Sequence, residues 1–146
     1  MKQAEWFYNS MVLPVITYCC LVNLHNTETQ VYKLTSLENW AKRIINTNDQ
    51  KIISIVKYKQ RYACKFVRRC IDADVCDNFL GYFTTLDHSK HTRNNQNSIR
   101  LPAVRTEFAK KSSYFMAAKI YNDLPLEIRN EHNFNSFCRE LNVFLR

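Results

Sequence analysis

The chain has 146 residues, enough for one domain, and its 46% hydrophobic content excludes a disordered protein. One glycine and three prolines are too few for the tight turns of an all-β domain, so the composition predicts an all-α fold, an irregular bundle of six or seven helices. The net charge of +8 is concentrated in residues 40–111, which carry fifteen basic and six acidic residues. This excess predicts an anionic partner, most often nucleic acid.

The first 46 residues predict two helices separated by a polar loop at 23–30. Residues 4–22 form the first, with a break at Pro14, and residues 31–46 form the second. Both carry apolar side chains at helical spacing, which predicts that they pack in a core. In the first helix these side chains are Phe7, Met11, Val15 and Tyr18, and in the second they are Leu34, Leu37, Ala41, Ile44 and Ile45.

Residues 50–71 predict a third helix, with Asp49 as a possible cap, and this helix carries a basic stripe. Lys57, Arg61, Lys65 and Arg68 follow one another at intervals of four, four and three residues, which places them on one helix face about 16 Å long. Like charges at this spacing repel, so the stripe gains nothing from folding alone. It predicts contact with a polyanion, and the alternative is a solvated face whose long side chains cover apolar surface.

Three acidic residues, Asp72, Asp74 and Asp77, follow this helix. They are interpreted as the negatively charged start of a further helix, which turns Val75, Cys76, Phe79, Leu80 and Phe83 inward, rather than as a metal site. The pair His88 and His91 lies in a polar stretch without nearby cysteine or carboxylate partners, so it is weak as a metal site. No cofactor is expected.

The last third predicts helices after an extended stretch. Residues 99–104 alternate enough for a short strand, or a hairpin near 99–108. Ser112 or Ser113 begins a helix that ends at about Asn122, before Leu124-Pro125. The last helix covers about 134–145, with Asn133 or Asn135 as its cap and Phe137 and Leu141 on its apolar stripe. The chain is expected to be one domain, 1–146, in which 1–86 continues into a basic loop and C-terminal helices at 87–146.

Several function classes are disfavoured by what the sequence lacks. Gly81 is the only glycine, so a glycine-rich phosphate loop is excluded. The carboxylates are scattered, whereas polymerases and nucleases cluster them around metal ions. These observations predict a protein that is not an enzyme and takes no small-molecule substrate.

The compartment and membrane partners are also constrained. None of the six cysteines forms a Cys-x2-Cys pair, and the sequence has no Asn-x-Ser/Thr acceptor. Free cysteines are typical of a reducing setting, so an intracellular location, nuclear or cytoplasmic, is expected. The apolar run from Met11 to Leu24 has 14 residues and contains Pro14, too short to span a bilayer comfortably, so no membrane partner is expected.

Four stretches in order carry a family resemblance: SMVLPVITYCCLV at 10–22, KLTSLENWAKRII at 33–45, HTRNN at 91–95 and the stretch from Arg100 to Pro125. Together they resemble the C-terminal thumb and post-thumb region of non-LTR (LINE-type) retrotransposon reverse transcriptases, over about residues 6–146. The resemblance implies a helical thumb that grips template RNA and the nascent duplex. The matching positions are Pro14, Tyr18, Ala41, Arg43, Ile44, Thr92, Arg93, Asn94, Arg100, Arg105, Ser112, Asn122, Leu124 and Pro125.

The chain also departs from that family. Val22-Asn23 stands where the family usually has Trp-Gly, and the palm motif with its paired aspartates is missing, as are the fingers. The chain is therefore expected to be a fragment, a truncated copy or a domesticated remnant, with 1–86 as the thumb-like half.

The function expected from charge and resemblance together is non-catalytic, sequence-independent binding of an RNA or RNA–DNA backbone. Tyr58, Tyr62 or Tyr114 is a candidate for stacking on bases, with core packing the favoured role for each. The alternatives are a stand-alone helical protein–protein interaction module and an inactive remnant. The candidate binding residues are Lys57, Arg61, Lys65, Arg68, Arg93, Arg100, Arg105 and Lys110.

Overall fold

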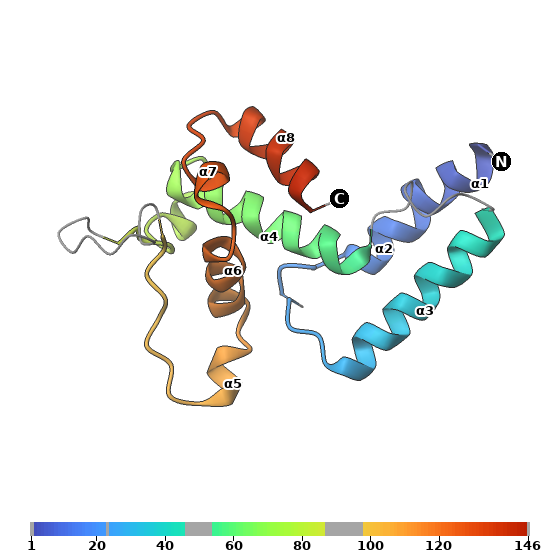
Figure 1. Ribbon diagram of the computed structural model, residues 1–146. Coiled ribbons are helices and arrows are strands. Elements are labelled where there is room, and N and C mark those ends of the chain that lie inside the picture. Colours follow the sequence, from blue (N-terminus) through green and yellow to red (C-terminus); the bar gives the residue numbers. More distant parts are fainter. Residues whose placement is uncertain (1, 23, 46–53, 87–97, 146) are drawn as a thin grey trace.

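The computed structural model describes residues 2–22, 24–45, 54–86 and 98–145, which form a helical protein in two parts (Figure 1). The N-terminal helices lie within residues 2–45 and extend to one side; this part is called the N-terminal hairpin. The C-terminal body (residues 54–145) packs around the central helix α4 (Ile55–Ile71). Within the described residues the only β-pairing is an isolated antiparallel bridge between Thr85 and Ile99. The all-α prediction is confirmed, and the strand expected near 99–108 is reduced to this bridge.

The first predicted helix is interrupted before Pro14 rather than at it. Its segments are α1 (Lys2–Phe7), the π-helical turn η1 (Tyr8–Val12) and α2 (Leu13–Thr17). The Leu13 N–H donates to the Tyr8 carbonyl five residues back, which is π-helical spacing. Proline lacks an N–H and clashes with the carbonyl four residues earlier, so the preceding turn is widened. The helix ends at Thr17, earlier than residue 22, and Cys19 follows with φ of 52°.

The second helix, α3 (Glu28–Ile45), begins three residues before its predicted start. A capping box explains this early start. The Thr27 N–H donates to Gln30 Oε1 at 3.0 Å, and the Gln30 N–H donates to Thr27 Oγ1 at 3.3 Å. The polar residues at 27–30, which predicted a loop, therefore form the helix start.

The start of α4 is capped from α3. Ser54, at the N-cap position, makes no side-chain capping bond. Instead Glu38 Oε1 accepts the Ile55 N–H at 2.5 Å and the Ser54 hydroxyl at 3.3 Å. The carboxylate thus lies at the positive end of the helix dipole. The capping role expected of Asp49 falls outside the described residues.

The prediction of a helix after Asp72 is wrong. Residues 72–83 contain only the 3₁₀ turn η2 (Asp77–Phe79). Asp72 ends α4 as its C-cap and pairs with Arg68, and Ala73 has φ of 57°. The left-handed backbone at Ala73 breaks the helix. Of the side chains predicted to turn inward, Phe83 is buried and Val75 is half-buried, whereas Cys76, Phe79 and Leu80 are exposed.

The C-terminal helices follow the predictions more closely. They are α5 (Glu107–Lys110), α6 (Ser113–Asn122), α7 (Leu126–Arg129) and α8 (Phe134–Phe144). Ser112 Oγ accepts the Phe115 N–H, and Asn133 Oδ1 accepts the N–H groups of Asn135 and Ser136. The helices at α6 and α8, with these caps, are confirmed. The short helices α5 and α7 were not predicted.

The main core lies where α6 and α8 pack on α4 (Figure 1). Phe137 and Leu141 on α8 are fully buried, so the predicted stripe of the last helix is confirmed. A single helix cannot bury these side chains by itself, so their burial depends on helices distant in sequence. The other core members on the three helices are Ala63, Cys64, Val67, Cys70, Ala117, Ala118 and Tyr121.

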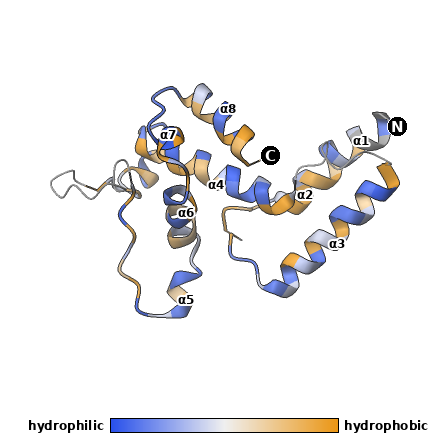
Figure 2. Cartoon of the chain, in the orientation of Figure 1, coloured by the Kyte–Doolittle hydropathy of each residue, from blue (hydrophilic) through white to orange (hydrophobic). Residues whose placement is uncertain are grey.

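The N-terminal hairpin has a much smaller core, made of Tyr8, Ala41 and Ile45. Figure 2 shows a largely apolar α2 beside an α3 in which apolar and polar residues alternate. The stripe Phe7, Met11, Val15 and Tyr18, predicted to pack inward, is exposed, as are Leu37 and Ile44. The predicted face exists, but the described chain does not cover it.

Candidate nucleic-acid interface

The basic segment 100–111 is held at its start by the fold of the C-terminal body. The Arg100 N–H donates to the Thr84 carbonyl at 2.9 Å, beside the bridge between Thr85 and Ile99. Ile99, the residue before Arg100, is held by Asn122 at the end of α6. The Asn122 Oδ1 accepts the Ile99 N–H at 2.8 Å, and its Nδ2 donates to the Ile99 carbonyl at 2.9 Å. Asn122 therefore acts as a strand partner for Ile99 and fixes where the basic segment begins.

A buried arginine reinforces the same anchor. Arg129 Nη1 donates to Ser98 Oγ at 2.5 Å, and its Nε donates to the Leu124 carbonyl at 3.1 Å. These bonds join the residue before Ile99 to the chain that follows α6. Arg129 was not predicted as a site residue, because it lies between the helices predicted to end at about Asn122 and to begin at about 134.

The far end of the segment is held by α5. Thr106 Oγ1 accepts the Ala109 N–H at 3.2 Å and caps this single-turn helix. Beyond it, the Ser113 hydroxyl donates to the Val22 carbonyl at 2.7 Å, a contact between α6 and the connection from α2 to α3. Residues 100–105 thus run without helix or strand between two fixed ends, along the side of the molecule (Figure 1).

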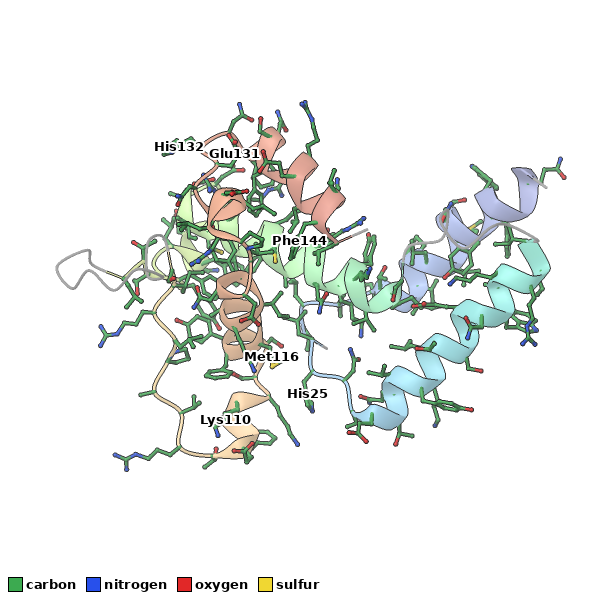
Figure 3. All side chains as sticks on the ribbon, in the orientation of Figure 1. His25, Lys110, Met116, Glu131, His132 and Phe144 are labelled. Atoms are coloured by element: carbon green, nitrogen blue, oxygen red, sulfur yellow. The ribbon has the colours of Figure 1, made fainter. Side chains whose placement is uncertain are left out.

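The cationic side chains of this segment face solvent. Arg100, Arg105 and Lys110 are all exposed, and no described carboxylate lies within ion-pair distance of Arg100 or Arg105. Lys110, labelled on α5 in Figure 3, pairs with Glu107 at 2.6 Å. This hydrogen bond lowers the pKa of the Glu107 carboxyl. Arg100, Arg105 and Lys111 are therefore the accessible charges of the segment, and Lys110 is partly neutralised.

The predicted stripe on α4 is divided by the fold. Lys57 is exposed and Lys65 is partly exposed, whereas Arg61 and Arg68 are buried. The expectation that all four share an exposed surface is wrong for the two arginines. Arg61 Nη2 donates to the carbonyls of Asn142 and Leu145 at 3.0 and 2.9 Å. These carbonyls lie at the C-terminal end of α8, where no following helical turn supplies an N–H for them.

Arg68 has a similar structural role. Its Nε bonds Asp72 at 2.8 Å, its Nη1 and Nη2 donate to the carbonyls of Arg129 and His132 at 3.4 and 3.2 Å, and its guanidinium lies 5.6 Å from the Phe137 ring centroid. Burial lowers the pKa of Arg68, but the hydrogen bond to Asp72 helps to outweigh it, so the pKa is raised. Arg68 is therefore a buried cation that connects α4 to the chain between α7 and α8.

Two tyrosines lie among the accessible lysines of α4. Tyr62, which was expected on the buried face, is 49% exposed and stacks on Tyr58 with ring centroids 6.1 Å apart. Lys57 and Lys65 flank this pair in sequence, so α4 presents an aromatic surface between two cations. By contrast, Tyr114 packs against Tyr82 and Phe83 with centroids 4.6 and 4.9 Å away, in agreement with its expected packing role.

Other predicted residues lie outside the described ranges. Arg93, Thr92 and Asn94 are among them, as are His88 and His91. Within the described residues, no three His, Cys, Asp or Glu side chains are grouped closely enough to hold a metal ion. No helix in the described part of the chain is both long enough and apolar enough to cross a bilayer.

Comparisons with known proteins add no relative to these observations. The chain matches none of the protein-family models, curated proteins or solved structures with which it was compared. The candidate interface is therefore defined by the chain's own geometry: an anchored basic segment at 100–111 and an accessible Lys57–Tyr62–Lys65 surface on α4.

Proposed function

We propose that this chain binds the sugar–phosphate backbone of RNA or of an RNA–DNA duplex, without reading base sequence and without catalysing a reaction. The role corresponds to that of the C-terminal region of a non-LTR retrotransposon reverse transcriptase, which the sequence resembles. The observation that carries the proposal is the segment 100–111, whose cations Arg100 and Arg105 are exposed and have no described acidic partner.

Anchoring makes this segment suited to a rod-like polyanion. Asn122 fixes the start at Ile99, and Thr106 begins the helix at the other end. An extended stretch advances roughly 3.3 Å per residue, so side chains five residues apart lie up to about 16 Å from one another. Phosphates on one strand of a duplex recur about every 3.4 Å along its axis, so Arg100 and Arg105 are far enough apart to contact different phosphates of one strand.

The exposed part of α4 supplies a second contact in this proposal. Lys57 and Lys65 contribute charge, and the half-exposed Tyr62 offers a ring face on which an unpaired base stacks. The buried Arg61 and Arg68 are left out of the contact, because their guanidinium groups already bond backbone carbonyls. The predicted stripe is thus reduced to its two lysines.

The salt dependence of binding tests this proposal. Each neutralised phosphate contributes about −0.7 to −0.9 to the slope of log K against log salt. Replacing Arg100, Arg105 and Lys110 with glutamine is expected to flatten this slope by roughly 2 to 3 units for an RNA–DNA duplex of mixed sequence. Fluorescence anisotropy of a labelled duplex measures the slope, and a duplex of scrambled sequence should bind equally well.

A charge-matched variant provides the control. Lys33, Arg43 and Arg139 are also exposed but lie on α3 and α8, and their replacement by glutamine removes the same three charges. An equal change of slope in both variants would show that net charge, not the 100–111 segment, drives binding. Absence of binding by the wild-type chain at low salt would contradict the proposal and favour the interaction-module alternative.

The interaction-module alternative has support of its own. Trp6, Trp40 and Phe7 on the N-terminal hairpin each expose more than half of a large aromatic side chain. Phe7 and Trp40 line the same groove, and contiguous apolar surface marks sites where another macromolecule packs.

A further inference from the structure

The N-terminal hairpin contains an apolar groove. It has a volume of about 290 Å³ and runs between the first helical stretch and α3. Its floor contains Tyr8, Ala41 and Ile45, which form the small core of the hairpin, and Val12, which packs against them. The groove is lined by residues from both sides of the hairpin, so it is a feature of their pairing rather than of one helix.

Exposed apolar side chains form the walls of this groove. Phe7 is on one side, and Leu37, Trp40 and Ile44 are on the other; each is at least half exposed. Met11 and Val15 follow Phe7 at intervals of four residues and are 55% and 75% exposed. Met11 and Val15 do not line the groove, but they continue the exposed stripe of Phe7 next to the lining residues Val12 and Ile16, so the hairpin presents one broad apolar face.

The size of this face matches a stable interface. Aromatic side chains bury roughly 150–250 Å² each and aliphatic ones less, so covering the exposed parts of the six named above removes on the order of 500 Å² per copy. A standard interface buries about 800 Å² per partner, of which somewhat more than half is apolar. The face is also at the upper end of the patches of about 300–600 Å² that typical monomers expose.

The charge distribution favours contact between two hairpins. Residues 1–45 carry four basic and three acidic residues, a net charge of +1, whereas the remaining residues carry a net charge of +7. Two copies of a chain with net charge +8 repel unless they meet where that charge is low. The hairpin is the part of the chain with low charge and high apolar exposure.

We propose that the apolar face of the N-terminal hairpin is covered by the same face of a second copy of this chain. Two antiparallel helix pairs that meet through their grooves form a four-helix arrangement, in which each copy supplies two helices. A twofold axis is the commonest symmetry of soluble oligomers, and it places the groove walls of each copy against the groove of the other copy. With this axis perpendicular to the helices, the basic bodies project to opposite ends of the dimer, where their charges are far apart.

Sedimentation of the purified full chain, freed of nucleic acid by nuclease and high salt, tests this proposal. Over about 1 to 100 µM we expect a reversible species of about twice 17.4 kDa. The dimer should persist in 1 M salt, because apolar burial is not screened, whereas association through nucleic acid is lost. If the chain stays monomeric over this range, the proposal is overturned. The hairpin face is then either exposed in solution or covered by a different protein.

Substitutions locate the contact. Leu37→Glu and Trp40→Glu, each made singly, are expected to raise the dimer dissociation constant roughly 100-fold or more, because each charge enters a symmetric interface twice. Both positions are exposed, so circular dichroism should show unchanged helix content. Tyr32→Glu is the matched control: Tyr32 is 76% exposed on the same helix but does not line the groove. A dimer that survives both groove substitutions, or that Tyr32→Glu disrupts equally, overturns the proposal, as does an open series of higher oligomers.

Discussion

The N-terminal hairpin and the C-terminal body are built from helices with similar apolar spacing, yet they bury their apolar side chains to very different extents. In the body, Phe137 and Leu141 on α8 are fully buried against α4 and α6. In the hairpin, Trp40 is 64% exposed and Leu37 is 50% exposed. Spacing thus determines which side chains share a helix face, whereas burial depends on whether another element reaches that face.

The largest effect expected in the body comes from its fully buried side chains. Phe137→Ala and Leu141→Ala should each lower the free energy of unfolding by about 2–5 kcal/mol, because a cavity opens against α4. Urea denaturation measures the loss. Val143→Ala on the same helix is the control, since Val143 is 71% exposed and should change stability by less than about 0.5 kcal/mol. Similar losses at all three positions would mean that α8 does not pack on the body as described.

A second test of the body uses pH. Burial, with a smaller contribution from Asp123, raises the pKa of the Cys64 thiol from 9.0 to about 12. The raised pKa means that the unfolded chain loses this proton first, so the contribution of Cys64 to stability is constant below about pH 9 and is lost between about pH 9 and 12. The slope is about 1.4 kcal/mol per pH unit, or up to about 4 kcal/mol over the whole window.

Comparison with Cys64→Ala isolates this contribution from the lysines and tyrosines that titrate in the same range. The variant is less stable at neutral pH but should lose stability more slowly as pH rises from 9 to 11. Urea titrations of both proteins at pH 7, 9, 10 and 11 give the two slopes. Parallel slopes above pH 9 would show that Cys64 ionises as freely in the folded chain as in the unfolded one.

Local signals account for the parts that the sequence predicts well. The helices at α6 and α8 combine an apolar stripe with a capping side chain, Ser112 or Asn133, a few residues away. These signals act within one turn and are visible in a single sequence. The helix predicted after Asp72 fails although its apolar spacing is suitable, because the chain takes left-handed backbone at Ala73.

Long-range contacts account for what the sequence does not predict. Arg61 and Arg68 were grouped with Lys57 and Lys65 by helical position alone, but the two arginines bond carbonyls more than 60 residues away. No pattern within α4 distinguishes them from the lysines. The planar guanidinium of arginine has five donors in a fixed geometry, which suits it to bond several backbone carbonyls. In a stripe of this kind, an arginine is therefore expected to be buried in such a role more often than a lysine.

The difference within this stripe is expected to appear in stability. Arg68→Met removes the bonds to two carbonyls and leaves Asp72 unpaired, so it should cost about 2–3 kcal/mol. Lys65→Met keeps a similar stem at a partly exposed position and should cost less than about 0.5 kcal/mol. Thermal or urea denaturation of the two variants measures the difference. If both substitutions prove neutral, the bonds of Arg68 contribute nothing to folding.

The smallest effect concerns the junction between the two regions, where Glu38 of the hairpin caps α4 of the body. Glu38→Ala removes the acceptor for the Ile55 N–H, which should cost about 0.5–2 kcal/mol, the range for loss of an N-cap. Glu38→Gln keeps an acceptor oxygen and removes only the charge at the positive end of the helix dipole. It should therefore cost less, about 0.3–1 kcal/mol.

Amide hydrogen exchange shows where this loss is felt. If the hairpin acts only as a cap, Glu38→Ala should speed exchange in the first turn of α4, next to Ile55, and leave the amides around Phe137 in α8 unchanged. Local opening of this kind occurs below the free energy of global unfolding. Equal acceleration in α4 and α8 would instead show that hairpin and body unfold as one cooperative unit. In that case the exposed hairpin face contributes to the stability of the whole chain, and covering it by a second copy would raise the protection of α8 as well.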